Sequence, residues 1–488
     1  MLEQARYKAA ELLVEGMKRM DTAFSLGMQA GSDVIDTCGH YGSEAMNLVI
    51  NRALSVETIK TILALVDREQ DGFDDYRQFV EEDLGVPAIY YEMLEGTKVI
   101  ENMPEHFAQI CKITGEIYGH CAHAGKQEGL HGPRPSRIYV AGEGSSIAMP
   151  GALASKFGEE FGKVPVINKP AAEIKDVCKG DTVILLSNGG TTDTAIALAK
   201  QAKDVGAVVV GITMDGESPL AEVCGEENTI VFNCGPEEVV GATKTVVEQC
   251  LIVSQIIRGL NGHMRRRDRN AFAGQCKNAK KGKGSMSDLT SEAERMLAGD
   301  RAPLDYENLA NLYRNALTQP IPQDIIRTIS MARELVIIGG EGVHREAALK
   351  VAETIGVKVR LIDTSFTLHG DAETMNDRDV VLILEPNTDK IKKIEKKISA
   401  RVPVFYFGSK LGDFENKLPH GRVIRTPRED NFQSIMDLGV LQNLFVRLAV
   451  YKGSKCQPKI ADKVGDPIEV TAKTQAQVAA AVPKEGAA

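Results

Sequence analysis

Two glycine-rich turns in the chain carry small hydroxyl side chains. The first reads Gly142-Glu143-Gly144-Ser145-Ser146, and the second runs from Ser187 to Thr194 as SNGGTTDT. Glycines allow a close backbone approach, and hydroxyl and amide groups at the start of a helix can bind a phosphate. One such turn alone would indicate only a tight connection with a capped helix. Two turns after neighbouring parallel strands predict a single phosphate site at one edge of a sheet.

Neither turn predicts a cofactor. A dinucleotide site needs the pattern GxGxxG, and the sequence from Gly142 to Ile147 lacks the third glycine. The nine cysteines form no CxxC pair, and we interpret them as reduced thiols. The cluster His120-Cys121-Ala122-His123 could bind a metal, but helical spacing would spread its side chains around the axis. We therefore expect neither a metal nor an organic cofactor.

The elements that position these turns are short apolar runs alternating with helical patterns. Continuously apolar strands of this kind are typical of parallel sheets covered on both faces. Two sets of runs open with the same Gly-Glu-Gly, at Gly142 and at Gly340, so a whole domain is repeated. The predicted fold class is α/β, with two doubly wound parallel-sheet domains, flavodoxin-like, after a helical amino-terminal region. The predicted strands are 137–141, 182–186, 208–212 and 229–232, then 334–338, 357–362, 380–384 and 402–407.

The chain divides into five predicted parts. A Pro- and Gly-containing stretch near residue 130 ends the helical region, and a basic stretch from Arg265 to Lys283 separates the two α/β domains. Because the protein is acidic, we interpret this stretch as a solvated loop rather than a nucleic-acid contact. The parts are a helical region (1–130), a first α/β domain (131–262), a basic linker with helices (263–325), a second α/β domain (326–470) and a disordered tail (471–488).

Composition excludes several partners. The 488 residues carry a formal net charge of -9, which disfavours a general binder of nucleic-acid phosphates. The amino terminus has no basic segment followed by an apolar core, and no apolar run approaches the ~20 residues that span a bilayer. We therefore expect a cytoplasmic protein whose partner is a small molecule, with no nucleic acid and no membrane.

The two turns together resemble the SIS (sugar isomerase) domain family, in the pairing of Gly-x-Gly-Ser-Ser with Ser-x-x-Gly-x-Thr. The order of two such domains resembles the isomerase half of the glucosamine-6-phosphate synthases. Four stretches carry the resemblance: 187–194, 235–244, the helix 346–353 with Leu368-His369-Gly370, and Lys452 to Lys463.

The resemblance implies a role for each matching residue. Phosphate would be held by Ser146, Ser187, Asn188, Gly190 and Thr192, and the sugar would be lined by Val240 and Ala242. Glu353, supported by Lys350, would move a proton between C1 and C2 of an open-chain sugar. His369 would assist ring opening, and Lys463 would reach the carbonyl. In the family the histidine loop comes from a second subunit, so the resemblance also implies a homodimer.

Departures from the family pattern leave the function open. Gly189 and Ala242 stand where the family has serines, and Asp371 follows His369-Gly370 where the family has proline. No Cys follows the initiator Met, so we expect no glutaminase activity. The predicted function is a ketose/aldose isomerase, acting on a sugar phosphate such as an amino-sugar or fructosamine phosphate, or a deaminase. The alternatives are a non-catalytic sugar-phosphate sensor and an isomerase of the phosphoglucose/phosphomannose type.

Overall fold

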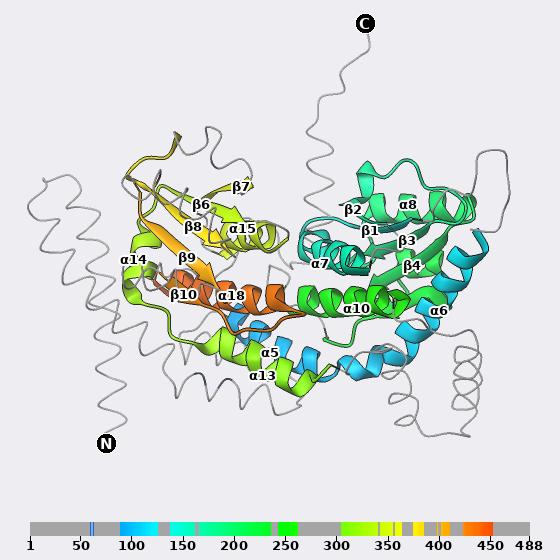
Figure 1. The fold of residues 1–488 in the computed structure, drawn as a ribbon, viewed down its shortest axis with the longest axis horizontal. Coiled ribbons are helices and arrows are strands. Elements are labelled where there is room, and N and C mark those ends of the chain that lie inside the picture. The colour runs from blue at the N-terminus through cyan, green and yellow to red at the C-terminus, as the bar shows by residue number, and fades with distance from the viewer. Residues whose placement is uncertain are drawn as a thin grey trace, which may run out of the picture. The chain divides into compact units, whose positions relative to one another are not determined.

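A computed structural model gives the fold of the chain (Figure 1). It describes the ranges 88–124, 137–161, 165–235, 243–261, 304–339, 342–354, 357–363, 374–384, 402–409 and 423–451, with Ile59, Ile62 and Ile398 as isolated positions. Within these ranges the side chains of 118–124, 160–161, 261, 352–354 and 363 lie outside the description.

The first α/β domain is built on a five-stranded sheet in the order β2-β1-β3-β4-β5, with all strand pairs parallel. Side chains of β1 and β3 are buried along their whole length, because helices cover both faces of the sheet. The strands are β1 (Ile138–Gly142), β2 (Val166–Pro170), β3 (Thr182–Leu186), β4 (Val208–Thr213) and β5 (Thr229–Val231). The helices are α7 (Ser145–Phe161), α8 (Asp193–Asp204), α9 (Pro219–Cys224) and α10 (Lys244–Asn261), with short 3-10 turns η3 (Ala171–Glu173) and η4 (Glu226–Asn228).

The second α/β domain repeats this topology. Its sheet has the order β10-β9-β8-β6-β7, and read from β7 the strands follow one another as in the first sheet. The predicted repeat of two doubly wound parallel-sheet domains is therefore confirmed. The strands are β6 (Glu334–Gly339), β7 (Lys358–Asp363), β8 (Asp379–Leu384), β9 (Val404–Gly408) and β10 (Val423–Arg425), and the helices are α15 (Val343–Thr354) and α18 (Gln433–Tyr451).

The sequence prediction missed β2 and β10, each of which lies at one edge of its sheet. β2 reads VINKP, and Asn168, Lys169 and Pro170 break the apolar run that marks a buried strand. β10 has only three residues, one of them buried. Both are edge strands, which need less apolar surface than the central strands.

Helices outside the two sheets pack against both domains. α5 contacts α10 of the first domain and α13, while α13 contacts α18 of the second domain (Figure 1). Tyr90 on α5 donates to the Leu317 carbonyl at 3.0 Å, and Tyr313 on α13 donates to Gln442 at 2.7 Å. The predicted helical character of the amino-terminal region is confirmed across 88–124. The helices outside the two sheets are α5 (Ala88–Glu101), η2 (Met103–His106) and α6 (Phe107–Ala124) before the first domain, and α13 (Tyr306–Thr318) and α14 (Gln323–Ser330) between the two domains.

No helix in the described ranges is both long enough and apolar enough to cross a membrane.

Candidate functional site

The two glycine-rich turns lie at one edge of the first sheet. β1 and β3 are neighbours in parallel, and Gly142 at the end of β1 faces Leu186 at the end of β3. The chain continues from β1 to the β2 edge and from β3 to the β5 edge, so strand order reverses between them. In open α/β sheets, ligands bind in the crevice at such a reversal. The expectation that both turns meet at one place agrees with this register.

A glutamine on α10 joins the two turns. Gln249 is fully buried, and its Nε2 donates to Asn188 Oδ1 at 2.6 Å and to Ser146 Oγ at 3.3 Å. Asn188 in turn donates from Nδ2 to Thr245 Oγ1 at 3.1 Å. Both ends of the Asn188 amide are thereby bound to α10, so this side chain orients the turn instead of pointing freely into it.

Hydroxyl groups of the turns keep hydrogens for a ligand. Ser146 Oγ accepts from Gln249, which leaves its own hydrogen available to donate. Ser187 Oγ and Thr192 Oγ1 are 3.0 Å apart, and only one of them can donate to the other. The hydroxyl hydrogen of the other residue is therefore left to donate to a ligand. Thr192 precedes α8 but makes no capping hydrogen bond with its side chain, so an anion can take the place of the cap.

Gly190 gives the second turn its shape. Its φ is +63°, and a Cβ at this position would lie 2.1 Å from Ser218 Oγ and 2.9 Å from Thr213 Oγ1. Its N–H donates to the Ser187 carbonyl at 3.2 Å, and its carbonyl accepts from Leu220 N at 3.0 Å. The turn can form only with glycine at this position.

Carboxylates, not basic residues, accompany the hydroxyls. The segments 142–146 and 187–194 contain no Lys, Arg or His. Glu143 is exposed, and its Oε1 accepts from Thr194 Oγ1 at 3.0 Å, while exposed Asp193 begins α8. The turns thus offer neutral donors to an anion, and two nearby negative charges oppose its binding.

A buried ion pair lies on α15 in the second domain. Lys350 Nζ is 3.4 Å from Glu346 Oε1, and both side chains are fully buried. Gly342, with φ +75°, begins this helix directly against α7, where a Cβ would lie 2.6 Å from Ala152 Cβ and 2.7 Å from the Ala148 carbonyl. α15 therefore packs on the helix that follows the first turn. Glu353 lies on α15 one turn after Lys350, and its side chain is outside the description.

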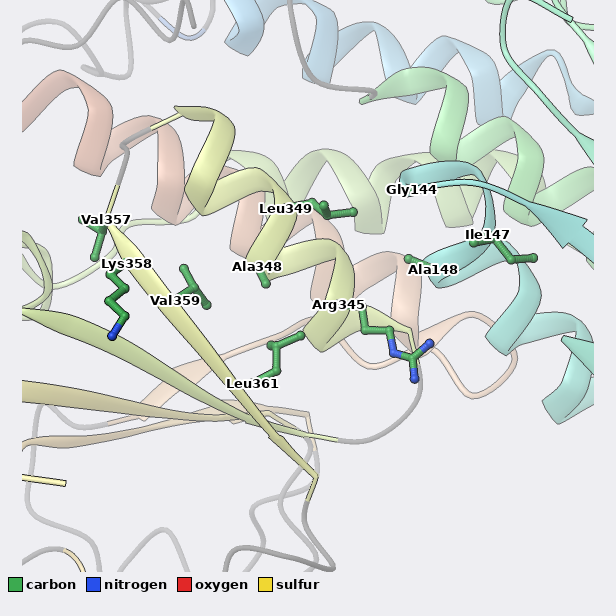
Figure 2. Close-up of a pocket in the computed structure, with 10 residues that line it drawn as sticks. All are labelled: Gly144, Ile147, Ala148, Arg345, Ala348, Leu349, Val357, Lys358, Val359 and Leu361. Atoms are coloured by element: carbon green, nitrogen blue, oxygen red, sulfur yellow. The ribbon is translucent and has the colours of Figure 1, made fainter. Parts of the chain in front are cut away.

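A cavity of about 570 Å³ lies between α7, α15 and β7, and Figure 2 shows the residues that line it. Its walls are mainly apolar, with Arg345 and Lys358 as the charged residues, and Gly144 of the first turn lies on its rim. None of the predicted phosphate ligands lines it. The cavity is lined by Gly144, Ile147, Ala148, Arg345, Ala348, Leu349, Val357, Lys358, Val359 and Leu361.

Several predicted site residues fall outside the described ranges. They are Val240, Ala242, His369 and Lys463, and their roles stay predictions, as does the role of Glu353. The side chains of His120, Cys121 and His123 are outside as well. In the parts of the chain that the structure describes, no group of three His, Cys, Asp or Glu side chains could hold a metal ion.

Sequence reasoning missed Gln249, Thr245 and Glu346. Thr245 and Gln249 are four residues apart on one helix, so they share a face. The two residues come directly after the 235–244 segment that carries the family resemblance, and this position was the signal that could have indicated a role in the site. Nothing in the sequence showed that this face would turn toward both glycine-rich turns.

Comparison with known proteins agrees with this geometry. Residues 134–258 match the SIS domain model. The chain is 29% identical to glutamine–fructose-6-phosphate aminotransferase of Chlorobaculum tepidum over 232 residues, or 44% of this chain and 34% of the relative. It is 24% identical to the Clostridium acetobutylicum protein of the same name over 272 residues, or 54% of this chain and 40% of the relative. The alignments thus span well under half the length of these relatives.

A solved structure shows the same fold. The C-terminal domain of glucosamine–fructose-6-phosphate aminotransferase from Francisella tularensis superimposes with a TM-score of 0.52 at 17% identity, covering 74% of this chain and 96% of that domain. Residues 134–258 are a SIS domain. The chain is homologous to the isomerase domain of the glutamine–fructose-6-phosphate aminotransferases, and its fold is of the phosphosugar-isomerase type.

Proposed function

We propose that this protein binds the open-chain form of a hexose phosphate and catalyses its aldose–ketose interconversion. Amino-sugar and fructosamine phosphates belong to the proposed substrate class, since the similar proteins are named as fructose-6-phosphate aminotransferases. The observation that carries the proposal is the meeting of two hydroxyl-bearing turns at the reversal of strand order, joined through Gln249.

The phosphate would be held by neutral donors. In this proposal the Ser146 hydroxyl and one hydroxyl of the Ser187–Thr192 pair would donate to the phosphate at the uncapped start of α8. Hydrogen bonds to an ionised acceptor are about twice as strong as neutral ones, which favours a phosphate over an uncharged group. Gly190 and Asn188 would shape this turn without carrying charge.

The chemistry would come from α15. Glu346, Lys350 and Glu353 are spaced four and three residues apart, so they lie along one face of the helix. In the proposed reaction the Glu353 carboxylate removes the proton from one carbon of the C1–C2 pair and returns it to the other. Meanwhile the carbonyl oxygen gains a proton and the hydroxyl oxygen on the neighbouring carbon loses one, so that this oxygen becomes the new carbonyl. Lys350 would hold Glu353 in place, His369 would move the ring-opening proton, and Lys463 would bind the carbonyl.

The proposed enzyme is a homodimer in which His369 comes from the second subunit. One NMR assay tests both reaction and assembly, by following deuterium uptake at C2 of hexose phosphates and amino-hexose phosphates in D2O. Wild type should exchange, Glu353→Gln should not, and Glu307→Gln, an exposed glutamate on α13, should exchange like wild type. Mixing Glu353→Gln with His369→Gln subunits should restore about a quarter of the rate, because half of randomly paired dimers regain one site.

Two results would reject this proposal in different ways. If wild type binds a sugar phosphate but exchanges none, the isomerase role fails, and a sensing role that needs only the phosphate site replaces it. If the mixed variants stay inactive while each retains sugar-phosphate binding, the shared site fails and the isomerase role does not.

A further inference from the structure

We propose that the helices preceding the SIS domain are part of the phosphate site, because α5 and η2 fix α10 in the position from which Gln249 and Thr245 orient the two turns. This inference rests on the proposed sugar-phosphate binding. Glu95 and His106 are the positioning residues that it assigns.

The start of α10 has two adjacent faces with different partners. Thr245 and Gln249 are four residues apart and bond Asn188 and Ser146. Lys244 and Glu248 are also four residues apart, each one position earlier, so their face is rotated by about 100° from the first. Among the described residues, this second face bonds α5, η2 and the segment that follows β5.

The first anchor is an ion pair. Lys244 is 3% exposed, and its Nζ lies 2.7 Å from Glu95 Oε2 on α5. Burial by itself would lower the pKa of the Lys244 ammonium, but the charge of Glu95, its hydrogen bond and the charge of Glu92 raise that pKa above its usual value. Removing Glu95 would leave a nearly buried cation without its main partner, so Lys244 would have to move.

The second anchor is a buried hydrogen-bonded cluster. His106 Nε2 of η2 lies 2.6 Å from Glu248 Oε1, and both side chains are at least nine-tenths buried. Glu248 also accepts from the backbone N–H of Asn233 at 2.9 Å and of Cys234 at 3.2 Å. η2 thus binds α10 and the chain after β5 at the same point.

The geometry of Gln249 makes it sensitive to small movements of α10. Its side chain is fully buried, its Nε2 donates to two acceptors that follow different strands, and its Oε1 accepts no hydrogen bond. A site of this kind functions only when held within about 0.5 Å of its geometry. Loss of either anchor would let the first turn of α10 shift, and Ser146 would lose the donor that fixes its hydroxyl.

The test measures the dissociation constant of fructose 6-phosphate by calorimetry for Glu95→Gln and for His106→Gln. Each should weaken binding by about three- to tenfold, as expected when a buried hydrogen bond is misaligned. Glu101→Gln is the matched control, since Glu101 lies on the same helix α5 but pairs at 3.4 Å with Arg314 of α13. It should bind like wild type. Thermal denaturation verifies that each variant is folded. If one of the two variants does not fold, the other still tests the inference.

A double-mutant cycle separates positioning from general loss of stability. Gln249→Ala should weaken binding by itself, and adding His106→Gln to it should cost less than about a further twofold, because the anchor acts through Gln249. Folded anchor variants that bind like wild type, or effects that add in full in the double variant, would overturn the inference. Absence of fructose 6-phosphate binding by wild type would instead reject the proposed function on which it rests.

Discussion

At the scale of single residues, the proposed phosphate site has no positively charged side chain in its two turns. The donors are hydroxyl hydrogens at Ser146 and at the Ser187–Thr192 pair, and their directions are set by neighbours. The residue types of the turns were readable from the sequence. The direction of each hydrogen was not, because it depends on Gln249, which lies more than 60 residues after Ser187 in the chain.

Glu143 gives a prediction at this scale. Its exposed carboxylate lies in the first turn, where it would repel a phosphate bound at the proposed site. Glu143→Gln should therefore tighten fructose 6-phosphate binding by about two- to fivefold at low salt, and the gain should shrink as ionic strength rises. Titration calorimetry at two salt concentrations measures this. Weaker binding in the variant would show that the carboxylate helps to hold the substrate.

At the scale of elements, every central strand was predictable, and so were the edge strands β5 and β7, but the edge strands β2 and β10 were not. β3 is predicted at its observed bounds, since Thr182 and the four apolar residues after it end at a serine. β4 and β6 each end one residue later than predicted, and β1 is shifted by one residue at both ends. β2 was not predicted because its polar residues and proline interrupt the apolar pattern of a strand.

Burial within these elements predicts which cysteines react. Burial raises the pKa of the Cys224 thiol on α9 to about 12, and burial together with the Glu346 charge raises the pKa of the Cys250 thiol on α10. The thiolate is the reactive form, so at pH 8 both should resist iodoacetamide in the folded protein, while the half-buried Cys178 and Cys234 react first. Reactivity of Cys224 should rise only as the pH approaches its pKa.

Mass spectrometry of peptides from the native, alkylated protein measures this order. Modification of Cys250 before Cys234 would contradict the packing of α10 between α7 and the amino-terminal helices.

At the scale of the whole molecule, two copies of one topology carry different chemistry. The first sheet has hydroxyl-bearing turns at its strand ends, and the second supplies a buried acid–base pair on α15. The sequence repeat predicted this division into two similar domains. It could not show that α5 contacts α10 and α13, since contacts between helices far apart in the chain leave no local periodicity.

The central claim is that phosphate binds where β1 and β3 end, and calorimetry with fructose 6-phosphate and with fructose tests it most directly. Wild type should bind the phosphorylated sugar and not fructose. Ser146→Ala should weaken that binding about tenfold or more, since it removes a donor to a charged group. Ser330→Ala on α14, which removes a hydroxyl that donates to the Arg327 carbonyl of the same helix, should leave the binding unchanged. Equal binding of both sugars by wild type, or unchanged affinity in a folded Ser146→Ala variant, would contradict the account.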